Sequence, residues 1–229
     1  MRVRGFTLIE LLVAISLMAL MAVLGWRGLD GISRTSVSLQ QRSDDLLTLQ
    51  ATLTQWGADL DAMTPQGDLS GLDWDGRTLR IVRRSAMQPG AGLVVVAWAR
   101  RSNGAPGDWL RWQSPPLTSR DELDLAWQKA ALWAQTPSDE DRQREVRTVA
   151  IDQWQIFYYR DNAWTNPLSS ADSQSAQGNA NANGVANAAA RPVAPLPDGV
   201  RLVLTLAGGQ AMSGALTRDW VSPLLGGGK

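Results

Sequence analysis

The feature that most constrains this chain is an apolar run near its N-terminus, at residues 6–26. Glu10 carries the only formal charge in these 21 residues, and the apolar pattern is continuous rather than confined to one helix face. At the rise of an α-helix the run is about 31 Å long, enough to cross the core of a bilayer. We therefore expect a transmembrane helix. A carboxylate inside it costs roughly 2.5–3.5 kcal/mol on insertion scales, so Glu10 is expected to have a role.

The residues at the start of this run form a motif. Arg2 and Arg4 precede the sequence Gly5-Phe6-Thr7-Leu8-Ile9-Glu10. This motif resembles the leader junction of type IV pilins and of type II secretion pseudopilins. The resemblance implies that a prepilin peptidase removes residues 1–5 as a leader, cutting between Gly5 and Phe6, and methylates Phe6. It also implies that Glu10 acts in assembly, by pairing with the terminal amine of a neighbouring subunit.

Residues 27–64 predict an amphipathic half of the same helix, so that one interrupted helix runs from about Phe6 to Met63. Bulky apolar residues recur every seven positions, with polar residues between them. This pattern fits a coiled coil or a helix face packed on a sheet, and beside a globular domain we favour the sheet. Three glycines predict a soft joint, although they also suit close helix packing in lipid. The heptad positions are Ile32, Leu39, Leu46, Leu53 and Leu60, followed by Leu49, Trp56 and Met63, and the glycines are Gly25, Gly28 and Gly31.

Residues 65–229 predict a β-rich domain, which gives an α+β fold with the long N-terminal helix packed on antiparallel sheet. Short apolar and aromatic runs alternate with Gly, Pro and Asp-Gly turn signals. Residues 121–135 have helical periodicity, with Ser119 as the N-cap candidate. Residues 169–190 contain few bulky side chains and predict a flexible surface loop. The expected strands are residues 79–82, 93–98, 109–112, 146–151, 154–159, 200–206 and 215–221.

Three segments resemble those of one subfamily, the J-type minor pseudopilins of the type II secretion system: residues 79–84, 154–159 and 196–202. The resemblance implies a pseudopilin fold and a place in the tip complex that primes pseudopilus assembly for export of folded proteins across the outer membrane. The implied partners are the I-, K- and H-type minor pseudopilins, the major pseudopilin and the prepilin peptidase. The implied location is the inner membrane, crossed once, with the C-terminal domain in the periplasm. A minor pilin of a type IV pilus shares every N-terminal feature and is the alternative.

Composition argues against several function classes. The chain has no cysteine and no histidine, so thiolate and imidazole metal ligands and any nucleophile–histidine pair are missing. We therefore expect neither an enzyme nor a cofactor. Charge is balanced, with 22 Lys and Arg against 22 Asp and Glu, so no basic excess predicts a nucleic-acid partner.

Acidic residues and tryptophans supply the remaining candidate sites. Asp73 and Asp75 offer oxygen ligands to Ca²⁺, but a hairpin turn explains them better. Asp59 and Asp61 face different directions on a helix, so they are not expected to form a catalytic pair. The acidic residues at 139–141 predict a solvated turn. Eleven tryptophans suit a membrane-tethered, glycan-binding module, although core packing is the preferred explanation for most of them.

Overall fold

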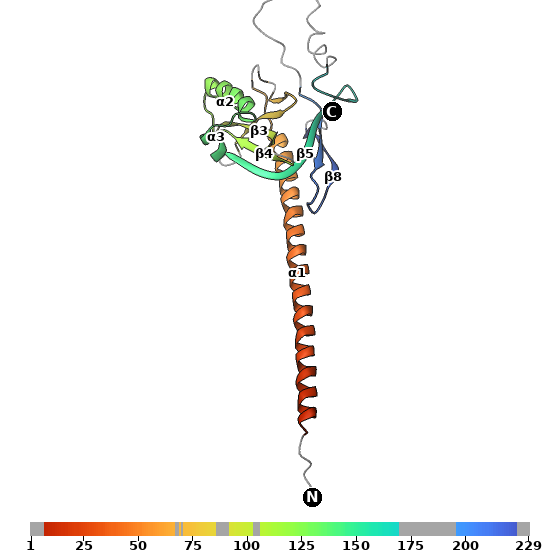
Figure 1. Cartoon of the computed structure of the whole chain (residues 1–229). Helices are drawn as coiled ribbons and strands as arrows, with labels where there is room; N and C mark the ends of the chain where they lie inside the picture. Colours follow the sequence, from red (N-terminus) through yellow and green to blue (C-terminus); the bar gives the residue numbers. More distant parts are fainter. Residues whose placement is uncertain are drawn as a thin grey trace, which may run out of the picture. The chain divides into compact units, whose positions relative to one another are not determined.

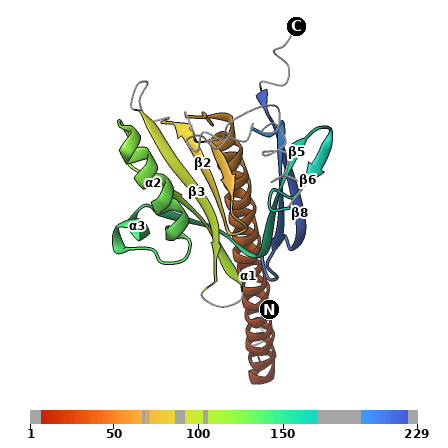
Figure 2. The ribbon, with the colours of Figure 1, turned by 90° about the horizontal axis from the view of Figure 1, so that it is seen from above.

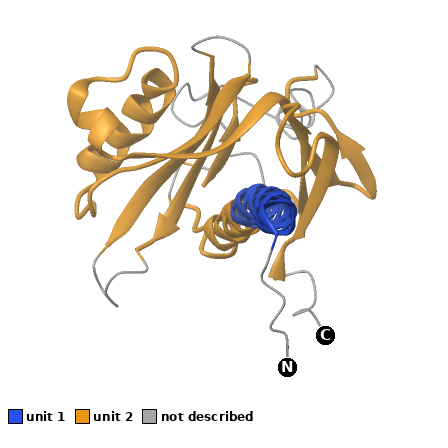
Figure 3. Cartoon of the chain, turned by 60° about the horizontal axis from the view of Figure 1, so that its bottom comes forward, with its two compact units in different colours: residues 1–46 blue, residues 47–229 orange. Residues whose placement is uncertain are grey.

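The computed structural model describes residues 7–66, 69, 71–85, 92–102, 106–169 and 196–223 (Figure 1). The chain divides into two compact units, residues 1–46 and residues 47–229 (Figure 3). Helix α1, Leu8–Asp61, contributes to both units, because the division falls after Leu46. Residues 47–229 are named the globular unit below. Most of the sequence expected to form the loop at 169–190 lies outside the described residues.

Helix α1 is continuous, so the predicted interruption at the three glycines is wrong. A glycine in a helix costs about 1 kcal/mol relative to alanine, but it keeps its backbone hydrogen bonds and does not by itself break the helix. Side-chain contacts also support this region: Arg34 Nε lies 3.0 Å from Asp30 Oδ2, and Thr35 Oγ1 donates to Gly31 O at 2.9 Å. A Cβ placed on any of these glycines meets nothing within 4 Å, so no described segment uses them for close packing.

An antiparallel sheet forms most of the globular unit. In the described part of the chain its strands lie in the order β1-β2-β3-β4-β5-β7-β8, and β6 pairs with β5. Helices α2, Arg120–Trp133, and α3, Asp139–Gln143, connect β4 to β5. The strands are β1 Leu72–Trp74, β2 Thr78–Arg84, β3 Leu93–Arg101, β4 Gly107–Gln113, β5 Glu145–Arg160, β6 Ala163–Thr165, β7 Gly199–Leu206 and β8 Gly214–Val221.

Helices cover both faces of β2 and β3 (Figure 2). The end of α1 packs through Trp56 and Leu60 on one face, and α2 packs through Leu123 and Ala130 on the other. Residues 94–98 of β3 are fully buried between them, which explains why the sequence there is continuously apolar rather than alternating. The predicted α+β fold, with the N-terminal helix packed on an antiparallel sheet, is therefore confirmed.

The last part of the heptad pattern packs on the sheet. Leu49, Trp56 and Leu60, which belong to the globular unit, are buried. The prediction that one apolar face lies on the sheet therefore holds for the end of α1, and it stays a prediction for residues 27–46. A seven-residue repeat indicates that one helix face is apolar, but it does not indicate which segment covers that face.

The two strands expected at residues 146–151 and 154–159 are one strand, β5. Its first half pairs with β4 and its second half with β7, and the register shifts between Ile151 and Gln153. This irregularity has the character of a β-bulge, which bends a strand without ending it, and β5 is visibly curved (Figure 1). The polar pair Asp152-Gln153 therefore marks a bulge, where the sequence suggested a break.

Helix α2 begins where the sequence predicts. The side chain of Ser119, the N-cap, accepts from Glu122 N at 3.2 Å. The Glu122 carboxylate in turn accepts from the backbone N–H groups of Thr118 and Ser119, at 2.8 and 3.2 Å. These hydrogen bonds lower the pKa of Glu122 and complete a capping box.

Gly92 is expected to be intolerant of a side chain. Its φ is +82°, and a Cβ there would lie 2.4 Å from Leu117 O. Leu93 and Leu117 exchange two backbone hydrogen bonds that hold the segment after β4 against β3. Replacing Gly92 with alanine should therefore lower the free energy of unfolding by about 2–3 kcal/mol, through backbone strain and displacement of Leu117. Urea denaturation of the full chain in detergent measures the change. Gly208→Ala is the control, because its Cβ meets nothing within 4 Å, and equal losses in the two variants would contradict the prediction.

Candidate functional site

The predicted assembly residue, Glu10, lies in a closed turn at the start of α1. Thr7 immediately precedes Leu8, the first helical residue. Glu10 Oε2 accepts from Thr7 N at 3.0 Å and from Thr7 Oγ1 at 2.8 Å, while Glu10 N donates to Thr7 Oγ1 at 3.4 Å. This reciprocal pattern is a capping box, and it holds the carboxylate at the end of the helix where the dipole favours negative charge.

Sequence reasoning found Glu10 but missed Thr7. The signal was present, because Thr-x-x-Glu directly before an apolar run is the signature of a capping box. Thr7 gives Glu10 a partner within its own chain, which offsets part of the cost of placing the acid in lipid. The predicted processing residues, Gly5 and Phe6, lie outside the described residues, just before this turn.

The first half of α1 has the length and composition of a membrane-spanning helix. An 18-residue window has a mean hydropathy of 2.5, and none of that window is buried. Leu8, Met21 and Trp26 are 77%, 73% and 75% exposed, so apolar side chains project along the whole segment. Such a surface is favourable in hydrocarbon and unfavourable in water.

Comparison with known proteins identifies the N-terminal segment. Residues 1–26 match the family described as the prokaryotic N-terminal methylation motif. The chain carries this motif on a long apolar helix. No curated protein matches the chain. Among solved structures, it is similar to one chain in the crystal structure of the GspK–GspI–GspJ complex from the type 2 secretion system of enterotoxigenic Escherichia coli, with 18% identity, a TM-score of 0.44, and coverage of 77% of this chain and 96% of that chain.

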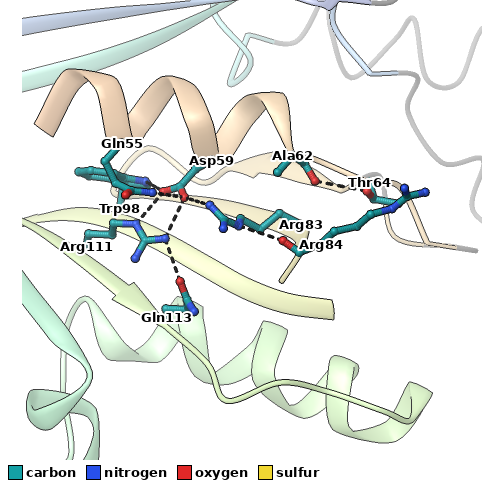
Figure 4. Close-up of polar contacts among 9 residues, drawn as sticks. All are labelled: Gln55, Asp59, Ala62, Thr64, Arg83, Arg84, Trp98, Arg111 and Gln113. Atoms are coloured by element: carbon teal, nitrogen blue, oxygen red, sulfur yellow. Dashed lines mark hydrogen bonds and ion pairs between the residues drawn. The ribbon is translucent and has the colours of Figure 1, made fainter. Parts of the chain in front are cut away.

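Asp59 is the centre of a buried polar cluster that joins α1 to three strands of the globular unit (Figure 4). Its carboxylate is fully buried and accepts five hydrogen bonds. The donors are Arg83 Nη1 at 2.5 Å, Arg111 Nε and Nη2 at 2.7 and 2.8 Å, Trp98 Nε1 at 2.9 Å and Gln55 Nε2 at 2.9 Å. Gln113 Oε1 accepts a further hydrogen bond from Arg111 at 2.9 Å.

The cluster is built to fix the end of α1 rather than to perform chemistry. Both oxygens of Asp59 are saturated by donors, so neither is available to take a proton from a substrate. One carboxylate and two largely buried guanidinium groups stabilise each other only while all three are present. Sequence reasoning missed this cluster. Its one sequence signal is that Asp59 interrupts the apolar face formed by Trp56, Leu60 and Met63.

The other acidic candidates have structural partners. Asp61 accepts from Trp220 Nε1 at 2.8 Å, so Asp59 and Asp61 do have separate surroundings, as predicted. Asp73 pairs with Arg80, and Asp75 Oδ1 accepts from the backbone N–H groups of residues 77 and 78 in the β1–β2 turn. The described residues contain no group of three or more acidic side chains able to hold a metal ion.

The prediction of a solvated turn at residues 139–141 is wrong, because this acidic segment begins helix α3. Asp141 is buried, and it accepts hydrogen bonds from Ser138 N and Oγ at 3.1 and 2.7 Å. Burial raises the pKa of Asp141, but the hydrogen bonds from Ser138 and the charge of Lys129 outweigh it, and the pKa is lowered overall. The sequence shows three acids in a row but not that the third is a capping residue.

Core packing accounts for most of the tryptophans, as expected. Trp127, Trp154 and Trp164 are partly buried, and Trp26, in the apolar half of α1, is 75% exposed. The described globular unit therefore presents no exposed row of tryptophan rings of the kind that stacks on sugars. The buried ones are Trp56, Trp74, Trp98, Trp109, Trp112, Trp133 and Trp220.

Proposed function

We propose that this chain is a J-type minor pseudopilin of the type II secretion system, part of the tip complex that primes pseudopilus assembly for export of folded proteins across the outer membrane. The observation that carries the proposal is the methylation motif at residues 1–26, on a helix able to cross a membrane and continuous with an α+β unit. The J-type assignment rests on the sequence segments at residues 79–84, 154–159 and 196–202, which contribute to β2, β5 and β7.

The proposal gives each part of the chain a role. Residues 1–5 are a leader removed by the prepilin peptidase, residues 6–26 cross the inner membrane, and residues 27–64 continue the helix. Residues 65–229 lie in the periplasm and contact the I-, K- and H-type minor pseudopilins and the major pseudopilin. The protein is a building block and not an enzyme, and the saturated hydrogen bonding of Asp59 agrees with that role.

Glu10 supplies the recognition step within the membrane. The terminal amine at Phe6 remains cationic after methylation, and opposite charges attract strongly where lipid screens them weakly. Before assembly, Thr7 holds the Glu10 carboxylate. In the filament, the amine of a neighbouring subunit competes with Thr7 for that carboxylate and so sets the axial register between packed helices.

Two other functions share part of this pattern. A minor pilin of a type IV pilus shares the N-terminal motif, and loss of protein secretion rather than loss of pili in a deletion strain distinguishes the two systems. A membrane-tethered glycan-binding module requires exposed aromatic rings, and the burial of the tryptophans in the described globular unit counts against it.

Replacing Glu10 with leucine tests the proposed function. We expect the mature chain still to begin at a methylated Phe6, because the change removes a charge from lipid and leaves the cleavage junction intact. We expect crosslinks to the other minor pseudopilins, and secretion with them, to fall about tenfold or more, as for loss of a charge-assisted contact. Mass spectrometry of the N-terminus and crosslinking in cells measure the two effects.

The matched control is Thr7→Val, which removes the hydroxyl of the capping box but keeps the acid. Loss of an N-cap side chain costs about 1 kcal/mol of helix stability. If recruitment depended on the cap alone, Thr7→Val and Glu10→Leu would weaken crosslinking equally. Undiminished crosslinks with Glu10→Leu would show that the acid has no role in assembly, and a wild-type chain beginning elsewhere than Phe6 would refute the pseudopilin proposal itself.

A further inference from the structure

An apolar pocket of about 500 Å³ lies in the globular unit where α1 ends. Its volume is within the range of roughly 300–1,000 Å³ that ligand pockets occupy. The walls come from four separate segments: the end of α1 with the residues that follow it, the end of β2, Leu196 three residues before β7, and the end of β8 with the residues that follow it. The apolar lining residues are Leu60, Ala62, Met63, Pro65, Leu196, Trp220 and Pro223.

Hydrogen bonds fix the walls of this pocket to one another. Trp220 Nε1 donates to Asp61 Oδ1 at 2.8 Å, which joins β8 to the end of α1. Arg84 N donates to Ala62 O at 3.1 Å, which joins β2 to the residues after the helix. On the remaining side, Ser222 N donates to Asp198 O at 2.8 Å. The pocket is therefore formed before any ligand arrives, which lowers the entropic cost of binding.

Two charged residues, Asp61 and Arg84, line the pocket, and they differ in their hydrogen-bond partners. Asp61 already accepts a hydrogen bond from Trp220. The Arg84 side chain is exposed and has no ion pair with a described residue, although its neighbour Arg83 is bound to Asp59. Figure 4 shows that the Arg84 side chain points away from the Asp59 cluster. An unpaired guanidinium at the rim of an apolar pocket is complementary to a carboxylate next to an apolar side chain.

We propose that this pocket receives a neighbouring subunit of the assembly through an apolar side chain that has an Asp or Glu within two residues of it in the sequence. The apolar side chain fills the space between Leu60, Met63 and Trp220, and the carboxylate binds Arg84. This inference rests on the proposed function for the identity of the neighbour. A rigid apolar pocket with an arginine at its rim that has no ion pair to a described residue is typical of the centre of a protein interface, where a few residues supply most of the affinity.

Site-directed photo-crosslinking of the full chain in its own membrane tests the proposal. A diazirine amino acid at Met63 probes the pocket, and one at Leu125, which is 67% exposed on α2, is the positional control. We expect the Met63 probe to label another pilin-like subunit, and peptide mapping to place the label beside an acidic residue. Arg84→Gln should lower the yield about tenfold, as for loss of a charged hydrogen bond, while Arg142→Gln, at an exposed arginine on α3, should leave it unchanged.

Several results would overturn the inference. The Met63 probe could label this chain's own residues 224–229 or an exported protein instead of a subunit. It could also label nothing above the level of the Leu125 probe, or give a crosslinking yield that Arg84→Gln leaves unchanged. The proposed function is judged separately by the mature N-terminus and the Glu10 crosslinks. A chain that passes those tests but gives no Met63 crosslink to a subunit loses this inference alone.

Discussion

Replacing Asp59 with alanine is expected to lower the free energy of unfolding of the globular unit by about 3–5 kcal/mol, the range for breaking a buried ion pair from one side. The change leaves Arg83 and Arg111 without a counter-charge, although their side chains are only 7% and 12% exposed. It also leaves Trp98 Nε1 without its acceptor in a fully buried position. Because domains are stable by only about 5–15 kcal/mol, this single loss is a large fraction of the total.

Urea denaturation of the full chain in detergent, followed by tryptophan fluorescence, measures the loss. With a slope of about 2 kcal/mol per M, the unfolding midpoint should fall by roughly 2 M. Asp61→Ala is the matched control, because it removes an acid two residues away that accepts one side-chain hydrogen bond from the described residues, donated by Trp220. That variant should lose only about 1 kcal/mol. Equal midpoints for the two variants would show that the Asp59 cluster is not coupled to the stability of the fold.

A second comparison separates loss of charge from loss of packing. If the penalty comes from two guanidinium groups left buried, then replacing Asp59, Arg83 and Arg111 together with apolar residues of similar size should restore most of the stability. If it comes from a cavity, the triple variant should remain as unstable as Asp59→Ala. The triple variant therefore identifies which physical effect holds the end of α1 on the sheet.

The parts of the fold that depend on neighbours in sequence were predictable. The Asp75-Gly76 turn joins β1 to β2, Ser119 caps α2, and β8 pairs with β7, as the local patterns indicate. These features follow from turn chemistry, capping and strand periodicity, which act over a few residues. The continuously apolar run at residues 93–98 also predicted a strand, and residues 94–98 of β3 are buried on both faces.

The parts that depend on distant residues were not predictable. The Asp59 cluster brings together α1, β2, β3 and β4, and the partners on the strands are 24 to 52 residues away in sequence. No local pattern specifies which arginine pairs with which acid, since each of these three strands contains at least one arginine. The prediction of two strands in place of β5 was wrong for a related reason. Only the pairing with two different strands, β4 and β7, shows why β5 continues past Asp152.

The N-terminal site was half predictable. Glu10 could be identified from the sequence as the one charge in an apolar run. The match of residues 1–26 to the prokaryotic N-terminal methylation motif confirms that this segment resembles the start of a type IV pilin. The hydrogen bonds from Thr7 are also encoded locally, in the Thr-x-x-Glu pattern of residues 7–10. In the proposed assembly, Thr7 raises the free-energy cost of pairing, since the amine of a second subunit would replace an existing partner of Glu10.

Replacing Gly5 with leucine is expected to leave most of the chain as an uncleaved precursor in the membrane. The resemblance to prepilins implies that the peptidase admits the chain at Gly5 only because that position has no side chain. The control is Gly28→Leu, which makes the same substitution at a position where a Cβ meets nothing within 4 Å. Mass spectrometry should find a mature N-terminus at methylated Phe6 for the control and at Met1 for Gly5→Leu. Normal cleavage of Gly5→Leu would refute the assigned junction.

The uncleaved precursor also tests how processing is linked to assembly. Without cleavage, the amine at Phe6 is still part of a peptide bond and carries no charge, so it offers nothing to the Glu10 of a neighbouring subunit. Gly5→Leu should therefore weaken incorporation of this chain into the proposed assembly, because the cationic amine at Phe6 never forms. Each proposed pair joins the amine of one subunit to the Glu10 of another. Gly5→Leu removes this chain's amine, whereas Glu10→Leu removes its carboxylate. If the contact forms in both directions along the filament, Gly5→Leu removes only the contact that this chain makes through its amine, and adding Glu10→Leu should reduce crosslinking further. If this chain engages its neighbours through its amine alone, the double variant should be no worse than Gly5→Leu, and that result would contradict the pairing proposed for Glu10.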